Sequence, residues 1–174
     1  MAPHATGVTA GLDRAAFVAR FGSVVEHSPW VAGAAYDAGP FADLAQLHGA
    51  FSTALLSAPV EQQLAVLRAH PDLAVAERAA QALTDESARE QAGAGLDRLA
   101  DEARLSLADA LTVYRDRFGF PFIACVRDHG GAGLAELVDA RLGSTPEQEL
   151  AVALAEVSSI VFHRLSDLLA EDPR

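Results

Sequence analysis

Lysine is absent from this chain of 174 residues. Its 13 basic residues are therefore all arginines. Without lysine the chain cannot form a Schiff base with a carbonyl substrate, hold covalent pyridoxal phosphate or use a P-loop lysine. No G-x-G-x-x-G loop, G-x-S-x-G elbow or H-E-x-x-H pair is present either. These absences exclude several large classes of enzyme, and they leave no local signal for a metal or a cofactor.

Cysteine and long apolar runs are also scarce. The single cysteine, Cys125, excludes an internal disulfide and a multi-cysteine metal cage, and it is typical of a reducing compartment. Residues 1–11 lack the basic segment and apolar run of a secretory signal. No stretch approaches the roughly 18 apolar residues of a spanning helix. We therefore expect a cytoplasmic protein that does not enter a membrane.

The charge balance is strongly acidic. The chain carries 24 acidic residues against 13 basic ones, for a formal net charge of −11. Such a field repels phosphate backbones, so nucleic acid is not expected as a partner. An anionic small molecule would have to be captured by a local cation.

The hydrophobic pattern is helical almost throughout, and good helix formers dominate. Apolar spacing, caps and breakers predict helices over residues 13–21, 41–57, 59–70, 84–95, 96–118 and 145–169. Only residues 120–126 are rich in aromatic and β-branched types, and we expect a buried extended or partly helical segment there. The sequence predicts an all-α fold, a compact single-domain bundle of about seven to eight helices over residues 1–174. Residues 1–11 and 170–174 are expected to be flexible tails.

Of the six histidines, His70 has the most informative position. It stands where Pro71 must end a helix, and the helix dipole favours the charged imidazole at that end. A catalytic acid or base is one interpretation. A histidine that caps the last carbonyls of the helix is the more common case.

Three further features are candidates for chemistry. Ser87, Glu90 and Gln91 share one face of the helix expected after Thr84, where they would suit a heterocycle rich in N–H and C=O groups or form an ordinary solvated face. Arg164 lies at the edge of an apolar stripe, so it either extends to water or offers its planar fork to a carboxylate. In residues 117–123, glycine and proline free backbone N–H groups for a ligand or simply form a core corner.

Four stretches, FGSVVEHSPWVA (21–32), HPDLA (70–74), LTDESAREQAGAGL (83–96) and YRDRFGFPFIACV (114–126), together resemble the 2-oxo-4-hydroxy-4-carboxy-5-ureidoimidazoline (OHCU) decarboxylase family. The resemblance covers residues 12–169. It implies a cofactor-free carboxy-lyase that forms (S)-allantoin in urate degradation, with a small-molecule substrate. A homodimer is compatible with it, although the sequence does not fix the oligomeric state.

The resemblance also implies roles for individual residues. His70 and Glu90 match the catalytic pair. The residues that match substrate-binding positions are Pro71, Ser87, Gln91, Phe122, Ile123, Ala124, Cys125, Val126 and Arg164, with the segment 122–126 contributing backbone donors.

Two positions depart from the family pattern. Val75 stands where HPDLA is commonly followed by glycine, and Gly143-Ser144-Thr145 stands where asparagine commonly precedes the last helix. The first departure leaves open an enzyme of the same fold that acts on another ureido or imidazole metabolite. A non-catalytic helical binding domain is the other alternative. The surroundings of Arg164 distinguish an enzyme from a non-catalytic binding domain, because an arginine that points to solvent favours the binding domain.

Overall fold

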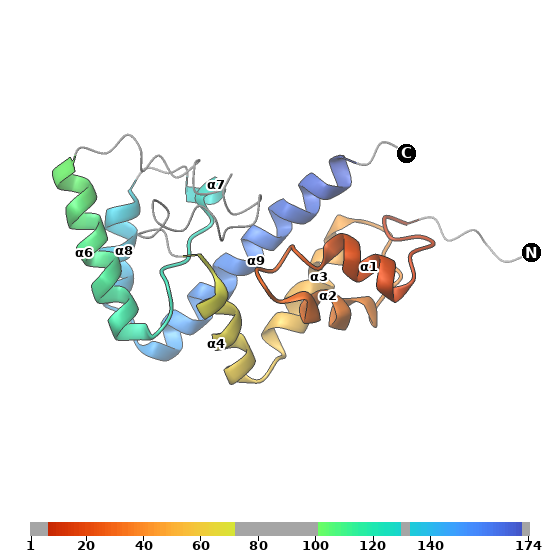
Figure 1. Ribbon diagram of the computed structural model, residues 1–174, viewed down its shortest axis with the longest axis horizontal. Coiled ribbons are helices and arrows are strands. Elements are labelled where there is room, and N and C mark those ends of the chain that lie inside the picture. Colours follow the sequence, from red (N-terminus) through yellow and green to blue (C-terminus); the bar gives the residue numbers. More distant parts are fainter. Residues whose placement is uncertain (1–6, 72–100, 130–132, 172–174) are drawn as a thin grey trace, which may run out of the picture. The chain divides into compact units, whose positions relative to one another are not determined.

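The computed structural model describes residues 7–71, 101–129 and 133–171. These ranges contain eight helices and no strand (Figure 1), which confirms the predicted all-α fold. The helices are α1 (Arg14–Phe21), α2 (Pro29–Tyr36), α3 (Leu44–Leu56), α4 (Val60–Ala69), α6 (Asp101–Phe118), α7 (Val126–His129), α8 (Leu134–Leu142) and α9 (Pro146–Ala170).

The chain divides into two compact units. The first consists of Met1–Val66 and Ser158–Arg174, and the second consists of Leu67–Val157. Helices α4 and α9 each contribute residues to both units. A single domain over residues 1–174 stays a prediction.

An aromatic cluster centred on Phe17 forms the core of the first unit, where α1 packs on α2 and α2 on α3. The Phe17 ring centroid lies 4.8 Å from that of Phe21, 5.4 Å from that of Tyr36, and 6.3 Å from those of Phe41 and Phe51. Aromatic side chains bury the largest apolar areas, and four of these five are almost fully buried. This cluster therefore accounts for much of the hydrophobic stabilisation of the unit.

Side-chain caps set the starts of α1 and α3 in this unit. Asp13 accepts a hydrogen bond from the Ala16 N–H at 2.8 Å, and Asp43 accepts one from the Gln46 N–H at 2.8 Å. The helix predicted from residue 41 therefore begins at Leu44, because Asp43 takes the extended conformation of an N-cap. Helix α2 was not among the predicted helices, and unlike α1 and α3 it begins without a side-chain cap hydrogen bond.

In the second unit, α6 packs against α8, and Figure 1 shows them side by side. Tyr114 of α6 is buried, with its ring centroid 4.7 Å from that of Phe118 and 5.1 Å from that of Phe122. Helix α6 ends as predicted before Gly119, which has a φ of +76° and donates its N–H to Arg115 O at 2.8 Å.

Helix α9 begins with the capping box that its sequence predicts. The Gln148 N–H donates to Thr145 Oγ1 at 3.2 Å, and the Thr145 N–H donates to Gln148 Oε1 at 3.0 Å. Proline at position 146 opens the helix, which ends one residue beyond the predicted 169. Leu154, Val157, Val161 and Leu165 of the predicted apolar stripe are buried.

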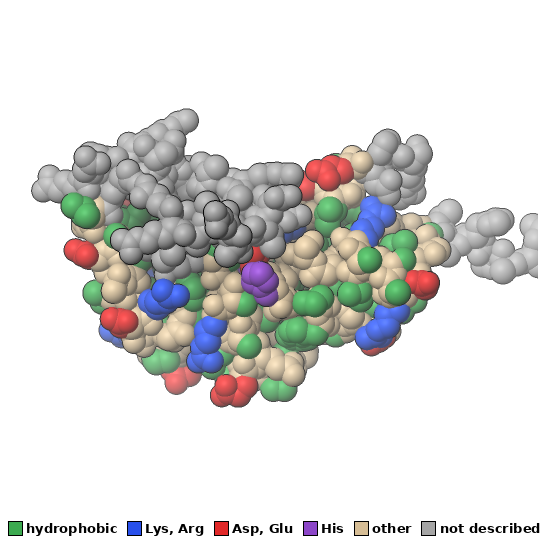
Figure 2. All heavy atoms as spheres, in the orientation of Figure 1, with side chains coloured by type: hydrophobic (Ala, Val, Ile, Leu, Met, Phe, Trp, Pro, Cys, Tyr) green, Lys and Arg blue, Asp and Glu red, His purple; other side chains and the backbone are tan. Residues whose placement is uncertain are grey.

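Charged side chains of both signs are scattered over the face drawn in Figure 2, in small groups rather than in one patch. Among the described residues, no helix combines the length and the apolar character needed to cross a bilayer.

Candidate active site

His70 lies one residue beyond the end of α4, as the following proline predicts. Its N–H donates to Leu67 O at 3.2 Å, which closes the last turn, and its Nδ1 atom is buried. The neighbouring Arg68 donates from Nε to Gly119 O at 3.2 Å. This contact ties the chain just before His70 to the start of the segment that follows α6.

That segment, residues 120–125, lies outside the helices and is buried, in agreement with the buried segment predicted there. Ile123 is 2% exposed and Ala124 is 8% exposed. The helix α7 begins at Val126, so the last residue of the predicted segment is already helical. The second unit therefore contains both His70 and Pro71 and the whole backbone segment that the family resemblance assigns to substrate binding.

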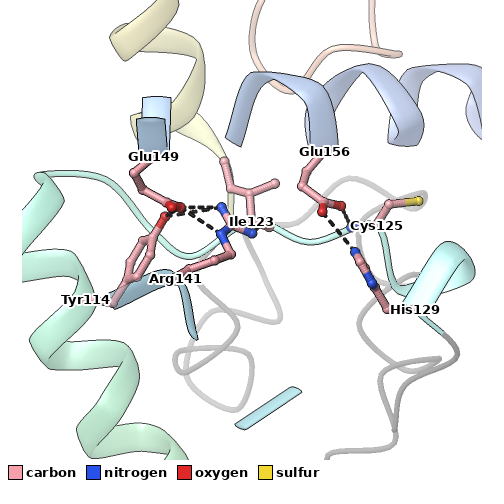
Figure 3. Close-up of polar contacts among 7 residues, drawn as sticks. All are labelled: Tyr114, Ile123, Cys125, His129, Arg141, Glu149 and Glu156. Carbon is pink, nitrogen blue, oxygen red and sulfur yellow. Dashed lines mark hydrogen bonds and ion pairs between the residues drawn. The ribbon is translucent and has the colours of Figure 1, made fainter. Parts of the chain in front are cut away.

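Arg141 of α8 anchors the middle of this segment. Its Nη1 donates to Ile123 O at 2.6 Å, while its Nε donates to Glu149 Oε1 at 2.8 Å. Tyr114 also donates its hydroxyl to Glu149. Burial raises the pKa of Tyr114 well above its usual range, and the hydrogen bond to Glu149 adds to the rise. Figure 3 shows these side chains turned toward one another.

Glu156 of α9 anchors the end of the segment. Its Oε2 accepts a hydrogen bond from the Cys125 N–H at 2.7 Å, and its Oε1 lies 2.9 Å from His129 Nε2 (Figure 3). Cys125 is 2% exposed, and burial raises the pKa of its thiol to about 11. The thiol is therefore neutral at physiological pH, which favours the inert interpretation of this cysteine.

The backbone donors of the segment are thus not equivalent. The Cys125 N–H, expected to face the substrate, is already bound by Glu156. By contrast, the N–H groups of Phe122, Ile123 and Ala124 donate to no other residue in the described part of the chain. These three buried donors remain for a ligand.

Arg164 belongs to the first unit and is 2% exposed. Its Nη1 donates to Val24 O at 3.0 Å and to Glu26 Oε2 at 3.2 Å. Glu26 is itself fully buried. The alternative that Arg164 extends into water is therefore wrong, and its charge is balanced by a buried carboxylate.

The remaining candidates, Ser87, Glu90 and Gln91, lie outside the described residues, and so does the departure at Val75. Three residues of the site region, Arg141, Glu149 and Glu156, were missed in the sequence. Arg141 lies in the last turn of a helix and Glu149 in the first turn of another, where such charges are common. The only available signal was the charge of residues 149 and 156 on a helix otherwise rich in apolar residues.

The described part of the chain is an all-α protein in which charged side chains hold a buried backbone segment. The sequence pattern of the OHCU decarboxylase family matches residues 10–166. The chain is 41% identical over 162 residues to the putative 2-oxo-4-hydroxy-4-carboxy-5-ureidoimidazoline decarboxylase of Homo sapiens, covering 93% of this chain and 94% of that protein. It is 40% identical to the decarboxylase of Bos taurus, covering 93% and 95% of the two chains.

A solved structure agrees with these sequence relatives. The crystal structure of an (S)-allantoin synthase superposes with a TM-score of 0.71 at 29% identity, covering 90% of this chain and 51% of that one. The chain therefore belongs to the OHCU decarboxylase family, whose named members are carboxy-lyases.

Proposed function

We propose that this protein decarboxylates OHCU to (S)-allantoin in urate degradation. The observation that carries the proposal is the family match over residues 10–166, which spans both units of the structure. Within that match, His70 ends a helix in the same unit as the anchored segment 120–125.

The substrate is a small imidazoline that carries a hydroxyl, a carboxylate and a ureido group. When the bond between the ring carbon and the carboxylate breaks, CO₂ leaves and the electron pair of that bond moves into the ring, where the C=N bond accepts it. The protein has to orient the carboxylate before this step. It also has to assist loss of the hydroxyl proton and deliver a proton to one face of the neighbouring ring carbon. This chemistry requires no amine nucleophile, in agreement with a chain that lacks lysine.

In this proposal His70 serves the hydroxyl and carboxylate end of the substrate as acid or base, with Pro71 beside it. Glu90 shares the proton transfer, and Ser87 and Gln91 bind polar atoms of the ureido group or ring. In the backbone from Phe122 to Val126, the N–H groups that Glu156 does not bind supply donors, and Arg164 holds a carbonyl or the carboxylate. The Glu26 carboxylate supports this role, because it fixes the guanidinium of Arg164 in a buried position.

The test is formation of (S)-allantoin from freshly oxidised urate, followed by circular dichroism. We expect rapid stereospecific product formation, and a rate no faster than the spontaneous reaction would refute the proposal. His70→Ala and Glu90→Ala should each lose about 10²- to 10⁴-fold in kcat, the usual value of one acid or base group. His48→Gln is the matched control, since His48 is bound by Ser52 and Ser158 in the first unit and should keep near-normal activity.

A cytoplasmic location and a homodimer are finer proposals that rest on the sequence alone. The single cysteine supports the first. Sedimentation analysis of the purified protein tests the second, and a monomer at all accessible concentrations would contradict it.

A further inference from the structure

The peptide unit between Ile123 and Ala124 is held from its carbonyl side. Arg141 Nη1 donates to Ile123 O at 2.6 Å. This peptide is trans, because the cis bond recorded in the described residues is Gly39–Pro40. The C=O and N–H of a planar trans peptide point in opposite directions. Binding of the carbonyl therefore directs the Ala124 N–H away from Arg141.

Arg141 itself has little freedom to move. Its Nε and Nη2 both donate to Glu149 Oε1, at 2.8 and 2.5 Å, and its guanidinium carbon lies 4.4 Å from the Phe122 ring centroid. The Glu149 side chain is fully buried. A planar guanidinium with several fixed partners is a rigid anchor.

The next peptide unit is held through its N–H. Glu156 Oε2 accepts the Cys125 N–H at 2.7 Å, so the peptide units on both sides of the Ala124 Cα carry a charged anchor (Figure 3). Glu149 and Glu156 are seven residues apart on α9, which places them on one face two turns apart. One helix face therefore supports both anchors, indirectly through Arg141 and directly through Glu156.

These two peptide units contain the N–H groups of Ala124 and Cys125. Glu156 binds that of Cys125, so the Ala124 N–H remains as a donor. Ala124 is 8% exposed, and its N–H donates to no other described residue. Buried backbone N–H groups without an acceptor are rare in folded proteins. A donor that is buried, fixed in direction and unpaired within the described chain is suited to a substrate oxygen that gains negative charge during the reaction.

We propose that Arg141 and Glu156 are positioning residues of the reaction, which hold the Ala124 N–H as a preorganised hydrogen-bond donor to a substrate oxygen. Neither side chain has to contact the substrate. The proposal rests on the decarboxylase function proposed above. It adds a reason for two charged side chains, Arg141 and Glu156, that acid–base chemistry at His70 does not explain.

Glu156 provides the sharper test, because its side chain is partly exposed and can be changed without leaving a deeply buried charge. Glu156→Ala removes the acceptor of the Cys125 N–H, whereas Glu156→Gln keeps an amide oxygen in its place. We expect kcat of Glu156→Ala to fall about 10- to 100-fold, as for a small misplacement of a reacting group. KM should change much less, because a donor to the transition state acts mainly on kcat. Glu156→Gln should retain most of the wild-type kcat.

His129→Gln is the matched control. It removes the imidazole beside Glu156 Oε1 but leaves the contact of Oε2 with the Cys125 N–H. We expect its kcat to stay close to the wild-type value. Arg141→Lys tests the other anchor, since one ammonium group keeps the charge beside Glu149 but cannot also reach Ile123 O. We expect a fall in kcat like that of Glu156→Ala.

The outcomes separate this proposal from the one on which it rests. If the wild-type protein does not accelerate (S)-allantoin formation, the decarboxylase function fails. If the wild-type protein is active and the folded Glu156→Ala and Arg141→Lys variants keep its kcat, the positioning role is overturned. Equal losses in Glu156→Ala and Glu156→Gln would also overturn it. Should Glu156→Ala not fold, Glu156→Asp replaces it, because the shorter side chain keeps the charge but shifts the acceptor.

Discussion

Two buried arginines, one in each unit, bind a carboxylate and a backbone carbonyl at the same time. Arg164 in the first unit binds Glu26 and the carbonyl of Val24. Arg141 in the second unit binds Glu149 and the carbonyl of Ile123. Both arginines therefore hold a non-helical stretch of backbone from a helix.

The two sites differ in where the acceptors come from. Val24 and Glu26 belong to the same loop between α1 and α2, so Arg164 joins one loop to α9. Around Arg141, Glu149 is on α9 and Ile123 is in the segment 120–125. Tyr114, whose hydroxyl accepts from Nη2 at 3.3 Å, is on α6. The same pair of residue types thus fixes one loop in the first unit and crosslinks four parts of the core in the second.

The largest expected effect is the loss of Arg141. Arg141→Met leaves Glu149 as an uncompensated buried charge, and breaking a buried pair in this way usually costs about 3–5 kcal/mol. We expect a loss of this size in the free energy of unfolding, measured by urea titration. The double variant Arg141→Met/Glu149→Leu should recover much of it, because the unpaired charge is gone. A double variant no more stable than Arg141→Met would contradict this account.

A smaller effect is expected from Glu26→Gln in the first unit. The amide oxygen can still accept from Arg164, so the cost is the loss of a charge-assisted hydrogen bond, about 1–3 kcal/mol. Glu149→Gln is the matched change in the second unit and should cost more, because Glu149 Oε1 accepts from both Arg141 and Tyr114. Equal losses in the free energy of unfolding of the two variants would contradict the expected difference between the two sites.

The smallest effect concerns the Cys125 thiol, which reports on the second unit alone. Its pKa is about 11 in the folded protein against an ordinary 9.0. Between these values the folded state holds more protons than the unfolded state, so this group lowers the free energy of unfolding as pH rises through that window. At neutral pH we expect slow alkylation by iodoacetamide in the wild-type protein and in Glu26→Gln. Alkylation should be faster in Arg141→Met, and an equal rate in all three proteins would contradict a local effect.

Local sequence predicted the parts of the fold that local chemistry determines. The box of Thr145 and Gln148, the stop at Gly119 and the helix end before Pro71 each depend on residues within a few positions of one another. Helices α2, α7 and α8 were not assigned to their residues, because α7 has only four residues and neither α2 nor α8 begins with a side-chain cap hydrogen bond like those of α1 and α3.

The residues of the candidate site differ in the same way, since some could be found from local sequence and others could not. His70 could be singled out from the proline that follows it, and Arg164 from its place beside an apolar stripe. Arg141, Glu149 and Tyr114 come together only through folding, since they are separated by 8 to 35 positions in the sequence. Sequence also cannot show which backbone N–H groups are already bound. For that reason Cys125 was expected to offer a donor that Glu156 already engages.

The two carboxylates of α9 have a consequence for how this helix can change. Each residue of an α-helix advances the direction of its side chain by about 100° and its height by about 1.5 Å. One residue inserted or deleted between positions 149 and 156 would turn one carboxylate away from its partner, whichever residue was used. The exposed positions between them, Ala151, Val152 and Ala155, are therefore free to vary in composition, whereas the length of the stretch is not. A library of point substitutions there should retain many active variants, whereas single-residue insertions should retain almost none.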